Sequence, residues 1–135
     1  MADKAPTAAN VRTSVIPKRG TAGVGIAAGD HLAIAADNSL QLFDANSGTP
    51  ELRIFAGVAV CGAALGQPVL YVYQDPAFTP GYAIAAGDIV IGSATPGKAC
   101  ADADAASGWY KTFIGIGIGG NQMNLNPIPA GAPVP

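Results

Sequence analysis

The chain has 135 residues, of which half are hydrophobic and only 12% are charged, whereas about 25% are charged in a typical soluble domain. This length suits one domain, and the formal net charge of −2 provides no basic face for nucleic acid. No stretch reaches the ~20 apolar residues of a membrane helix, and the N-terminus lacks the apolar run of a signal peptide. We therefore expect a cytoplasmically made protein with no nucleic-acid or membrane partner, part of whose surface is buried against another protein.

Charge is unevenly distributed along the chain. Residues 1–19 contain four basic side chains and one acidic one, whereas residues 20–135 contain three basic and eight acidic ones. A basic arm on an acidic body suggests docking on an acidic neighbour, although a solvated and partly disordered terminus is the alternative. Residues 1–22 are rich in Thr and Ala and show no periodicity, so we assign them as an extended basic arm.

Short β-type runs separated by turns recur along the middle of the chain. Eighteen glycines and eleven prolines leave no window of a dozen residues with clean helical periodicity. In the last run, Ile114, Ile116 and Ile118 share one parity and glycines the other, which is typical of a strand packed closely on both faces. The predicted strands are, in chain order, Gly25–Ile26, His31–Ala35, Leu40–Phe43, Ile54–Val60, Val69–Tyr73, Ile89–Ile91 and Phe113–Ile118.

The most informative feature is an internal repeat with an offset of 58 residues. The block Ile26–Asp30 (IAAGD) recurs letter for letter as Ile84–Asp88. At the same offset, Phe55–Val60 (FAGVAV) returns as Phe113–Ile118 (FIGIGI). Two separated blocks that share one offset are hard to obtain by chance, so the sequence predicts a duplicated β-unit.

The repeat defines the predicted domain organisation. Residues 24–78 and 82–126 are expected to be the two copies, which close into one compact β-barrel or sandwich over residues 23–126. Residues 127–135 (PIPAGAPVP) have proline at every second or third position and are expected to stay outside the sheet interior as an extended Pro-rich tail. If both termini are arms, deleting residues 2–19 should leave the barrel folded.

Each copy has the same predicted local roles. The glycine of each AAGD block supplies the permissive φ of a tight turn. Asp30 and Asp88 then bond nearby backbone amides as the chain enters a strand. A hairpin follows that strand, around residues 37–38 in the first copy and 95–97 in the second.

Residues that could carry catalysis or bind a metal are scarce. His31 is the only histidine, and the other copy has Ile89 at its position, so we expect an ordinary strand residue. Cys61 and Cys100 lie at non-equivalent repeat positions and are expected to remain free thiols. The segment Asp102–Asp104 offers two oxygen ligands, but the rest of a calcium-binding loop is missing. We therefore predict a protein that is not an enzyme, with no catalytic residue, cofactor or metal site.

Two further patterns are formally compatible with a ligand site. Residues 115–120 satisfy G-x-G-x-x-G, but a dinucleotide site needs this motif between a strand and a helix N-terminus. The motif lies inside a predicted strand, so we assign its glycines to close packing between strands. Six aromatic side chains could line a glycan groove, but packing in the core or at a protein interface is our preferred interpretation. They are Tyr71, Tyr73, Phe78, Tyr82, Trp109 and Tyr110.

Six short motifs follow one another in a recognisable order over about residues 23–126. They are Gly29-Asp30, Gly57-Val58-Ala59, Gly66-Gln67-Pro68-Val69, Gly87-Asp88, Pro96-Gly97-Lys98 and Ile114-Gly115-Ile116. Their order resembles a family of tailed-phage proteins, the small β-barrel capsid decoration or cement proteins. Each motif is short and rich in glycine, so the resemblance rests on the order of all six. The chain departs from this pattern in its aromatic QDPAFTPGY insert and its Pro-rich tail.

The resemblance implies a structural virion protein that binds the major capsid protein on the outer surface of an expanded capsid and stiffens it against internal DNA pressure. It also implies a homo-oligomer, a trimer in preference to a dimer. Few charges and two extended arms fit such a subunit, since arms add buried area and many copies give avidity. The alternative is a β-clip or antifreeze-like carbohydrate-binding module, which predicts a polar, aromatic groove. A minor enzyme subunit is disfavoured because titratable clusters are lacking.

Overall fold

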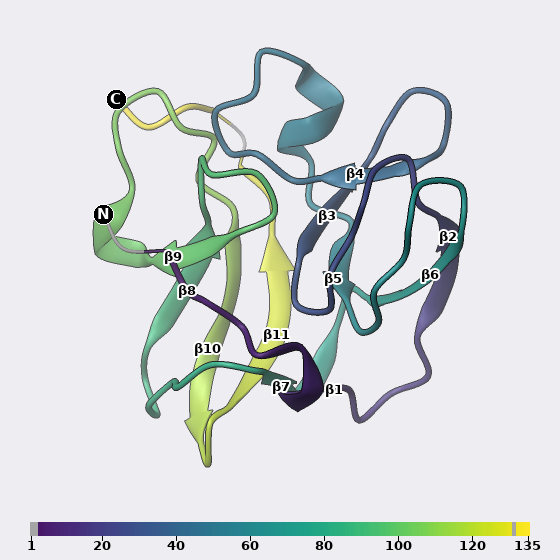
Figure 1. Cartoon of the computed structure of the whole chain (residues 1–135). Helices are drawn as coiled ribbons and strands as arrows, with labels where there is room; N and C mark the ends of the chain where they lie inside the picture. Colours follow the sequence, from purple (N-terminus) through teal and green to yellow (C-terminus); the bar gives the residue numbers. More distant parts are fainter. Residues whose placement is uncertain (1–2, 131) are drawn as a thin grey trace.

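The computed structural model describes residues 3–130 and 132–135, and these residues form an all-β protein (Figure 1). Its antiparallel strands are β1 (Val11–Arg12), β2 (Lys18–Thr21), β3 (His31–Ile34), β4 (Leu40–Leu42), β5 (Gly57–Ala59), β6 (Pro68–Val72), β7 (Asp75–Pro80), β8 (Ile89–Gly92), β9 (Ala99–Ala101), β10 (Phe113–Gly119) and β11 (Gln122–Ile128). Three short 3-10 helices accompany them, η1 (Ala8–Asn10), η2 (Pro50–Arg53) and η3 (Asp102–Asp104). The expected fold class is confirmed.

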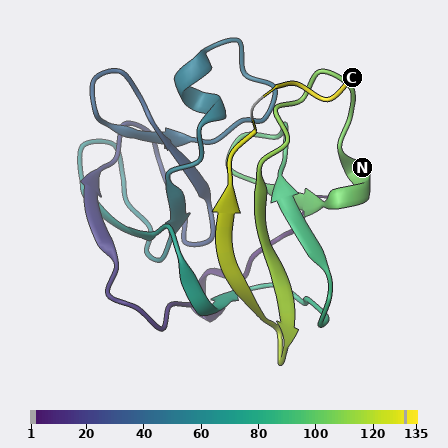
Figure 2. The ribbon, with the colours of Figure 1, turned by 180° about the vertical axis from the view of Figure 1, so that it is seen from behind.

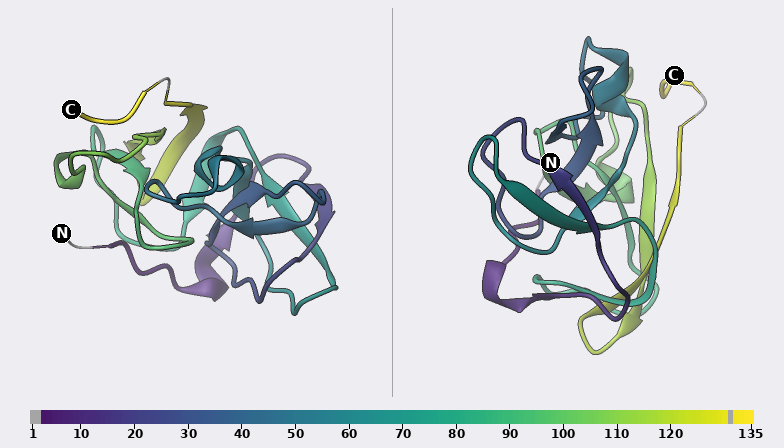
Figure 3. Two further views of the ribbon diagram at one scale, coloured as in Figure 1. Left: turned by 90° about the horizontal axis from the view of Figure 1, so that it is seen from above. Right: turned by 90° about the vertical axis from the view of Figure 1, so that its right-hand side faces the viewer.

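The strands are divided between two sheets that lie side by side (Figure 1). The six-stranded sheet has the order β1-β7-β11-β10-β8-β9, and the five-stranded sheet has the order β2-β6-β5-β3-β4. Ala22, which follows β2, forms a bridge with Leu40 of β4. This contact brings the two edges of the five-stranded sheet together, so that sheet curls into a partly closed barrel, seen from above in Figure 3.

Two groups of buried apolar side chains stabilise this arrangement. The smaller group comes from the five-stranded sheet and its flanking loops, and consists of Ala22, Ile26, Leu32, Leu40, Ala59 and Val69. The larger group draws on both sheets and includes Phe43, Phe55, Phe78, Ile114 and Leu125. Because the larger core is shared between the sheets, the two repeat units form one domain rather than two.

The predicted duplication is visible in the strand order. Without β1, the six-stranded sheet reads β7-β11-β10-β8-β9, which is the order β2-β6-β5-β3-β4 repeated in the second unit. The register repeats too, because His31 pairs with Val58 in the first sheet and Ile89 pairs with Ile116 in the second. The helices η2 and η3 lie between corresponding strands of the two units. The fold is therefore built from two repeated β-units, as predicted, but their strands span residues 18–72 and 75–128 rather than 24–78 and 82–126.

The two IAAGD blocks form the same turn. The carboxylate of Asp30 accepts a hydrogen bond from the N–H of Ala27, and that of Asp88 accepts one from the N–H of Ala85, each at 2.9 Å. The glycines of the two turns have φ values of +94° and +90°, a region that glycine adopts without steric strain. The predicted roles of both blocks are thus confirmed at the level of single hydrogen bonds.

The sequence pattern predicts β3, β4, β5, β6, β8 and β10, but not the other five strands. The expected strand Gly25–Ile26 is reduced to an isolated bridge between Ile26 and Ala63. The QDPAFTPGY insert contains β7, which is the first strand of the second unit. Its two prolines hide it from a pattern-based prediction, since proline normally argues against a strand.

The assignment of residues 1–22 as an arm outside the domain is wrong, although much of the segment is extended. Within it, β1 pairs with β7 and β2 pairs with β6 over four residue pairs. The segment therefore completes an edge of each sheet. Deleting residues 2–19 would remove β1 and half of β2, so on this structure we expect the deletion to destabilise the domain.

The domain boundary at residue 127 is wrong as well, because β11 continues to Ile128 and lies between β7 and β10. Phe113 pairs with Ile128 while Gly115 pairs with Leu125, so β11 has one extra residue at this point. Pro127 lies in that bulge, where the ladder of backbone hydrogen bonds is interrupted and proline is tolerated. Beyond the strand, the N–H of Val134 donates to the carbonyl of Trp109 at 2.7 Å.

Candidate interaction surface

Three basic side chains lie on the stretch that connects the two sheets. β1 ends at Arg12 in the six-stranded sheet, and β2 begins at Lys18 in the five-stranded sheet. We call residues 12–19 the basic segment; it runs along the bottom of the molecule in Figure 1. Arg12, Lys18 and Arg19 are all exposed, and the segment contains no acidic residue. The sequence-predicted basic arm is therefore a crossing between sheets that presents its charges to solvent.

A buried carboxylate fixes the basic segment in place. Asp75, the first residue of β7, is 0% exposed. Its Oδ2 accepts hydrogen bonds from the Thr13 hydroxyl at 2.9 Å and the Ser14 N–H at 2.7 Å. Its Oδ1 accepts hydrogen bonds from the Ser14 hydroxyl and from the Ala77 N–H at 3.0 Å. Four donors thus converge on one carboxylate and hold residues 13 and 14 against β7.

The ionisation of Asp75 follows from these contacts. Burial acts to raise the pKa of this carboxyl group, because a charged group loses its hydration inside the protein. The hydrogen bonds from Ser14, Ala77 and Thr13 act in the opposite direction and outweigh burial, so the pKa of Asp75 lies below its ordinary value. Asp75 is therefore ionised near neutral pH, and its charge strengthens the attachment of the segment.

The middle of the basic segment is apolar and exposed. Ile16 is 94% exposed and Val15 is 36% exposed. Both border a hollow of about 290 Å³ whose other lining residues are Lys18, Val72, Tyr73 and Gln74. The Nζ atom of Lys18 lies 5.9 Å from the centre of the Tyr73 ring. The segment therefore combines a fixed backbone, three cations and an apolar side chain that no described residue covers.

A second exposed apolar surface lies on the outside of the six-stranded sheet. Ile89 of β8 pairs with Ile116 of β10, and Ile118 follows two residues later. Their exposed fractions are 39%, 37% and 48%. Figure 2 shows β8, β10 and β11 side by side at the front. We call Ile89, Ile116 and Ile118 the isoleucine face; this part of β10 is packed on one side only, which corrects the expectation of close packing on both faces.

The first two glycines of the G-x-G-x-x-G pattern face the interior, whereas Gly120 is exposed in the turn to β11. A Cβ added to Gly115 would lie 2.5 Å from the carbonyl oxygen of Asn124, and one added to Gly117 would lie 1.9 Å from that of Ala85. These positions allow the neighbouring backbone to approach closely, as the sequence predicts. The motif ends in the turn to β11, so no helix N-terminus follows that could hold a phosphate.

The single histidine is enclosed in the core. His31 is 3% exposed, and its ring lies against Phe55 with 5.4 Å between the ring centres. Burial and the nearby positive charge of Lys98 lower the pKa of His31 to about 4. The imidazole is therefore neutral at physiological pH. The ring is enclosed by the core, and the residue is the first of β3.

The other candidate ligands are dispersed. Cys61 and Cys100 are both free thiols, and burial, followed by the charges of Asp104 and Asp3, raises the pKa of Cys100 to about 11. Asp102 lies in η3 and pairs with the Nζ of Lys111 at 2.5 Å. In the part of the chain that the structure describes, no three His, Cys, Asp or Glu side chains are grouped closely enough to hold a metal ion.

The six aromatic side chains do not form one groove. Phe78 and Trp109 are buried in the larger core. Three tyrosines instead lie beside basic side chains in different parts of the molecule: Lys4 beside Tyr82, Lys18 beside Tyr73 and Arg53 beside Tyr110. These contacts place each cation over a ring, where the negative face of the aromatic system attracts it.

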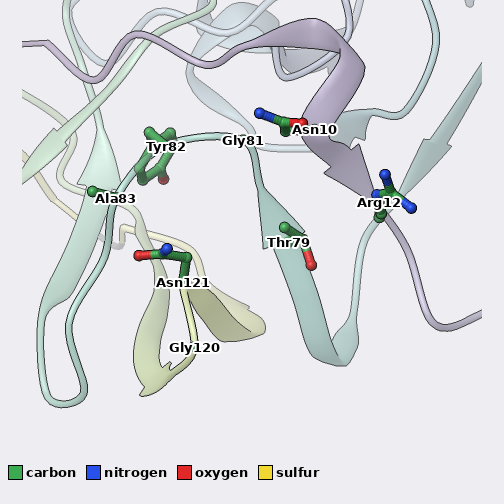
Figure 4. A pocket seen from close by; sticks show the side chains of 8 residues that line it. All are labelled: Asn10, Arg12, Thr79, Gly81, Tyr82, Ala83, Gly120 and Asn121. Atoms are coloured by element: carbon green, nitrogen blue, oxygen red, sulfur yellow. The ribbon is translucent and has the colours of Figure 1, made fainter.

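A polar pocket of about 380 Å³ lies beside the start of the basic segment (Figure 4). Figure 4 shows Asn10 and Arg12 on one side of it and Asn121, in the turn between β10 and β11, on the other. Thr79, the pairing partner of Arg12 on β7, lies next to Arg12. The remaining lining residues are Gly81, Tyr82, Ala83 and Gly120.

Sequence reasoning found the basic side chains but not the residues that position them. Asp75 was hidden because it precedes a proline in the aromatic insert, where a turn is the ordinary interpretation. Ile16 gave a weak signal, because Val15 and Ile16 form only a two-residue apolar run. Asn10, Thr79 and Asn121 come from three separate segments, and only the fold brings them together at one pocket.

Comparison with models of known protein families and with curated protein sequences found no match. Among the residues that the structure describes, no helix has the length and apolar character needed to span a bilayer.

Proposed function

We propose that this chain is a structural virion protein that binds the outer surface of a bacteriophage capsid and stabilises it, as a decoration or cement protein. Its partners are then the major capsid protein and further copies of itself, as a trimer in preference to a dimer. It is made in the host cytoplasm and acts on the virion surface. The proposal assigns no catalytic residue, cofactor or metal to the chain.

The observation that carries the proposal is the basic segment. Asp75 holds it firmly, so its exposed cations and Ile16 are presented without the loss of conformational freedom that docking imposes on a flexible arm. Neither Arg12 nor Arg19 has a hydrogen bond or ion pair from its side chain to another described residue. A fixed positive surface on an acidic protein suits docking on an acidic partner.

Two further features support a subunit that is held in an assembly. The isoleucine face and Ile16 place large apolar side chains on a surface with few charges to surround them. Such exposure is a common property of protein-binding surfaces. In addition, the six motifs that carry the resemblance to decoration proteins include the Gly29-Asp30 and Gly87-Asp88 turns, which have equivalent roles in the two units.

The carbohydrate-binding alternative has less support. It predicts a groove lined with several aromatic side chains, on whose faces sugar rings stack. The aromatic residues are dispersed over the core and three separate cation contacts, and only Tyr82 reaches the polar pocket. We therefore prefer the capsid-binding proposal.

The proposal is tested by electron cryo-microscopy of capsid shells. Shells assembled from the major capsid protein of the same genome are expanded, incubated with the purified chain, and imaged. The expected result is additional density on the outer surface into which the two-sheet domain fits, with the basic segment turned toward the shell. Expanded shells that remain bare at saturating protein concentration would contradict the proposal.

A further inference from the structure

The pocket beside Arg12 contains more hydrogen-bond donors than its own residues use. The guanidinium of Arg12 has five N–H groups and the amide of Asn10 has two, and neither side chain is bonded to a described residue. The amide oxygen of Asn121 accepts a hydrogen bond from the N–H of Ile84 at 3.3 Å. This bond fixes the Asn121 side chain and leaves its NH₂ group available.

The pocket also lacks negative charge. Its eight lining residues include one cation and no carboxylate. Elsewhere, Lys111 is neutralised by Asp102, and Lys4, Lys18 and Arg53 lie against tyrosine rings. Arg12 differs from these cations, because its charge is compensated neither by a carboxylate nor by an aromatic face of this chain.

We propose that this pocket binds a carboxylate group, with Arg12 as the principal contact. An ionised carboxylate only accepts hydrogen bonds, at about four lone-pair sites, and it matches the two parallel N–H groups of a guanidinium. Asn10 and Asn121 line the same pocket and offer amide N–H groups to an anion bound there. Thr79, beside Arg12, offers a hydroxyl donor.

In the assembled particle, the carboxylate belongs to an aspartate or glutamate side chain of the major capsid protein. This part of the inference rests on the proposed function. Arg12 is the first residue of the basic segment. An acidic partner surface that contacts Lys18 and Arg19 at the other end of the segment can therefore place a carboxylate in the pocket. Burying such a pair in the contact is favourable only if the carboxylate receives several hydrogen bonds, which the asparagines supply.

The pocket is tested first without any capsid protein. An aspartate blocked at both ends, N-acetyl-aspartate N-methylamide, is titrated into isotopically labelled protein and followed by NMR. The matched neutral probe is the corresponding asparagine compound. The expected result is a saturable shift of the Arg12 Nε–Hε, Asn10 and Asn121 side-chain signals with the aspartate probe only. Shifts that are absent, or equal for the neutral probe or for inorganic phosphate at the same ionic strength, would overturn the proposal.

Three variants make this test specific. Arg12→Gln should weaken binding of the aspartate probe about tenfold, because a two-point charge-assisted contact is lost. Arg12→Lys keeps the charge but not the planar fork, and should recover only part of the affinity. Arg19→Gln removes another exposed cation, which does not line the pocket, and should have no effect on binding of the aspartate probe. Equal losses in Arg12→Gln and Arg19→Gln would assign binding to general charge rather than to the pocket.

Attachment of the same variants to capsid shells separates this inference from the proposed function. If the pocket binds the probe and Arg12→Gln attaches to shells more weakly than Arg19→Gln, both parts of the inference are supported. If the probe binds but Arg12→Gln attaches like the unaltered chain, the capsid side chain is excluded as the occupant. If the probe does not bind while the unaltered chain attaches, the inference fails and the proposed function stands.

Discussion

The backbone N–H of Ser14 donates a 2.7 Å hydrogen bond to the carboxylate of Asp75, 61 residues farther along the chain. The Ser14 hydroxyl donates to the other oxygen of the same carboxylate. Through this contact the second repeat unit fixes the segment that precedes the first. We regard it as the basis of the proposed docking surface, because without it residues 13–17 would have only the neighbouring short strands to hold them.

Asp75→Asn should therefore destabilise the protein and loosen the basic segment. The substitution replaces one acceptor oxygen by a donor that faces donors, with an expected loss of about 2 kcal/mol in the free energy of unfolding. Trypsin should also cleave faster after Lys18 and Arg19. The control is Asp37→Asn, because Asp37 is an exposed carboxylate that accepts a hydrogen bond from the N–H of Ser39. Urea unfolding and a proteolysis time course that match the unaltered chain would show that the anchor is unimportant.

The same anchor has a predictable pH dependence. The pKa of Asp75 is lowered in the folded state, so its stabilising contribution is present above the ordinary carboxyl pKa. It is lost as the pH falls through the lower, folded-state pKa. The difference in unfolding free energy between the unaltered chain and Asp75→Asn should accordingly shrink in strong acid.

His31 should make the protein sensitive to milder acid. Its pKa is lowered from 6.5 to about 4 in the folded state, so above pH 6.5 both the folded and the unfolded forms are neutral. Below that pH only the unfolded form takes up a proton, and stability falls by about 3 kcal/mol before it levels off near pH 4. His31→Leu should remove this part of the pH dependence. Unfolding curves with the same pH dependence in both proteins would mean that the imidazole titrates normally.

Gly117 is predicted to be the glycine whose replacement is least tolerated in β10. A Cβ at this position would lie 1.9 Å from the backbone oxygen of Ala85, so the second AAGD turn would have to move. Gly117→Ala should cost about 2 kcal/mol or more in the free energy of unfolding. Gly48→Ala is the matched control, since nothing lies within 4 Å of its Cβ position. Equal stability of the two variants would contradict the close strand approach described above.

The two AAGD turns should respond alike to substitution. Asp30→Ala and Asp88→Ala each remove the 2.9 Å hydrogen bond to the turn amide three residues earlier. We expect both variants to lower the melting temperature by a few degrees and by similar amounts. Thermal unfolding followed by circular dichroism measures both. A clear drop in the melting temperature of one variant and none in the other would show that the two turns have the same shape but contribute unequally to stability.

Much of the fold was predictable because it depends on local sequence patterns that occur in both repeat units. The repeated IAAGD and F-x-G blocks identified the turns, the strands that follow them and the equivalence of the two halves. The hairpins around Asn38 and Gly97 were also predictable, and both residues have positive φ. These features depend on interactions between residues close together in the chain, so they can be predicted from one sequence.

The sheet edges and the pocket were not predictable, for physical reasons. β1 has only two residues, and β2 is short, polar and largely exposed, so neither strand gives a period-two hydrophobic pattern. β11 includes Pro127, which a strand tolerates only because a bulge falls there, and a bulge depends on the partner strand. The Asp75 anchor and the Arg12 pocket both join segments more than sixty residues apart, and only the tertiary fold brings them into contact.

Attachment to expanded capsid shells as a function of salt tests the central claim most directly. The variant Arg12→Gln/Lys18→Gln/Arg19→Gln removes the charge of the basic segment, and Arg53→Gln/Lys98→Gln/Lys111→Gln removes the same charge elsewhere. After circular dichroism has shown both to be folded, co-sedimentation should give at least about tenfold weaker attachment for the first variant at low salt, with the difference shrinking as salt rises. The second variant should attach like the unaltered chain. Equal attachment of all three proteins at low salt would contradict the account.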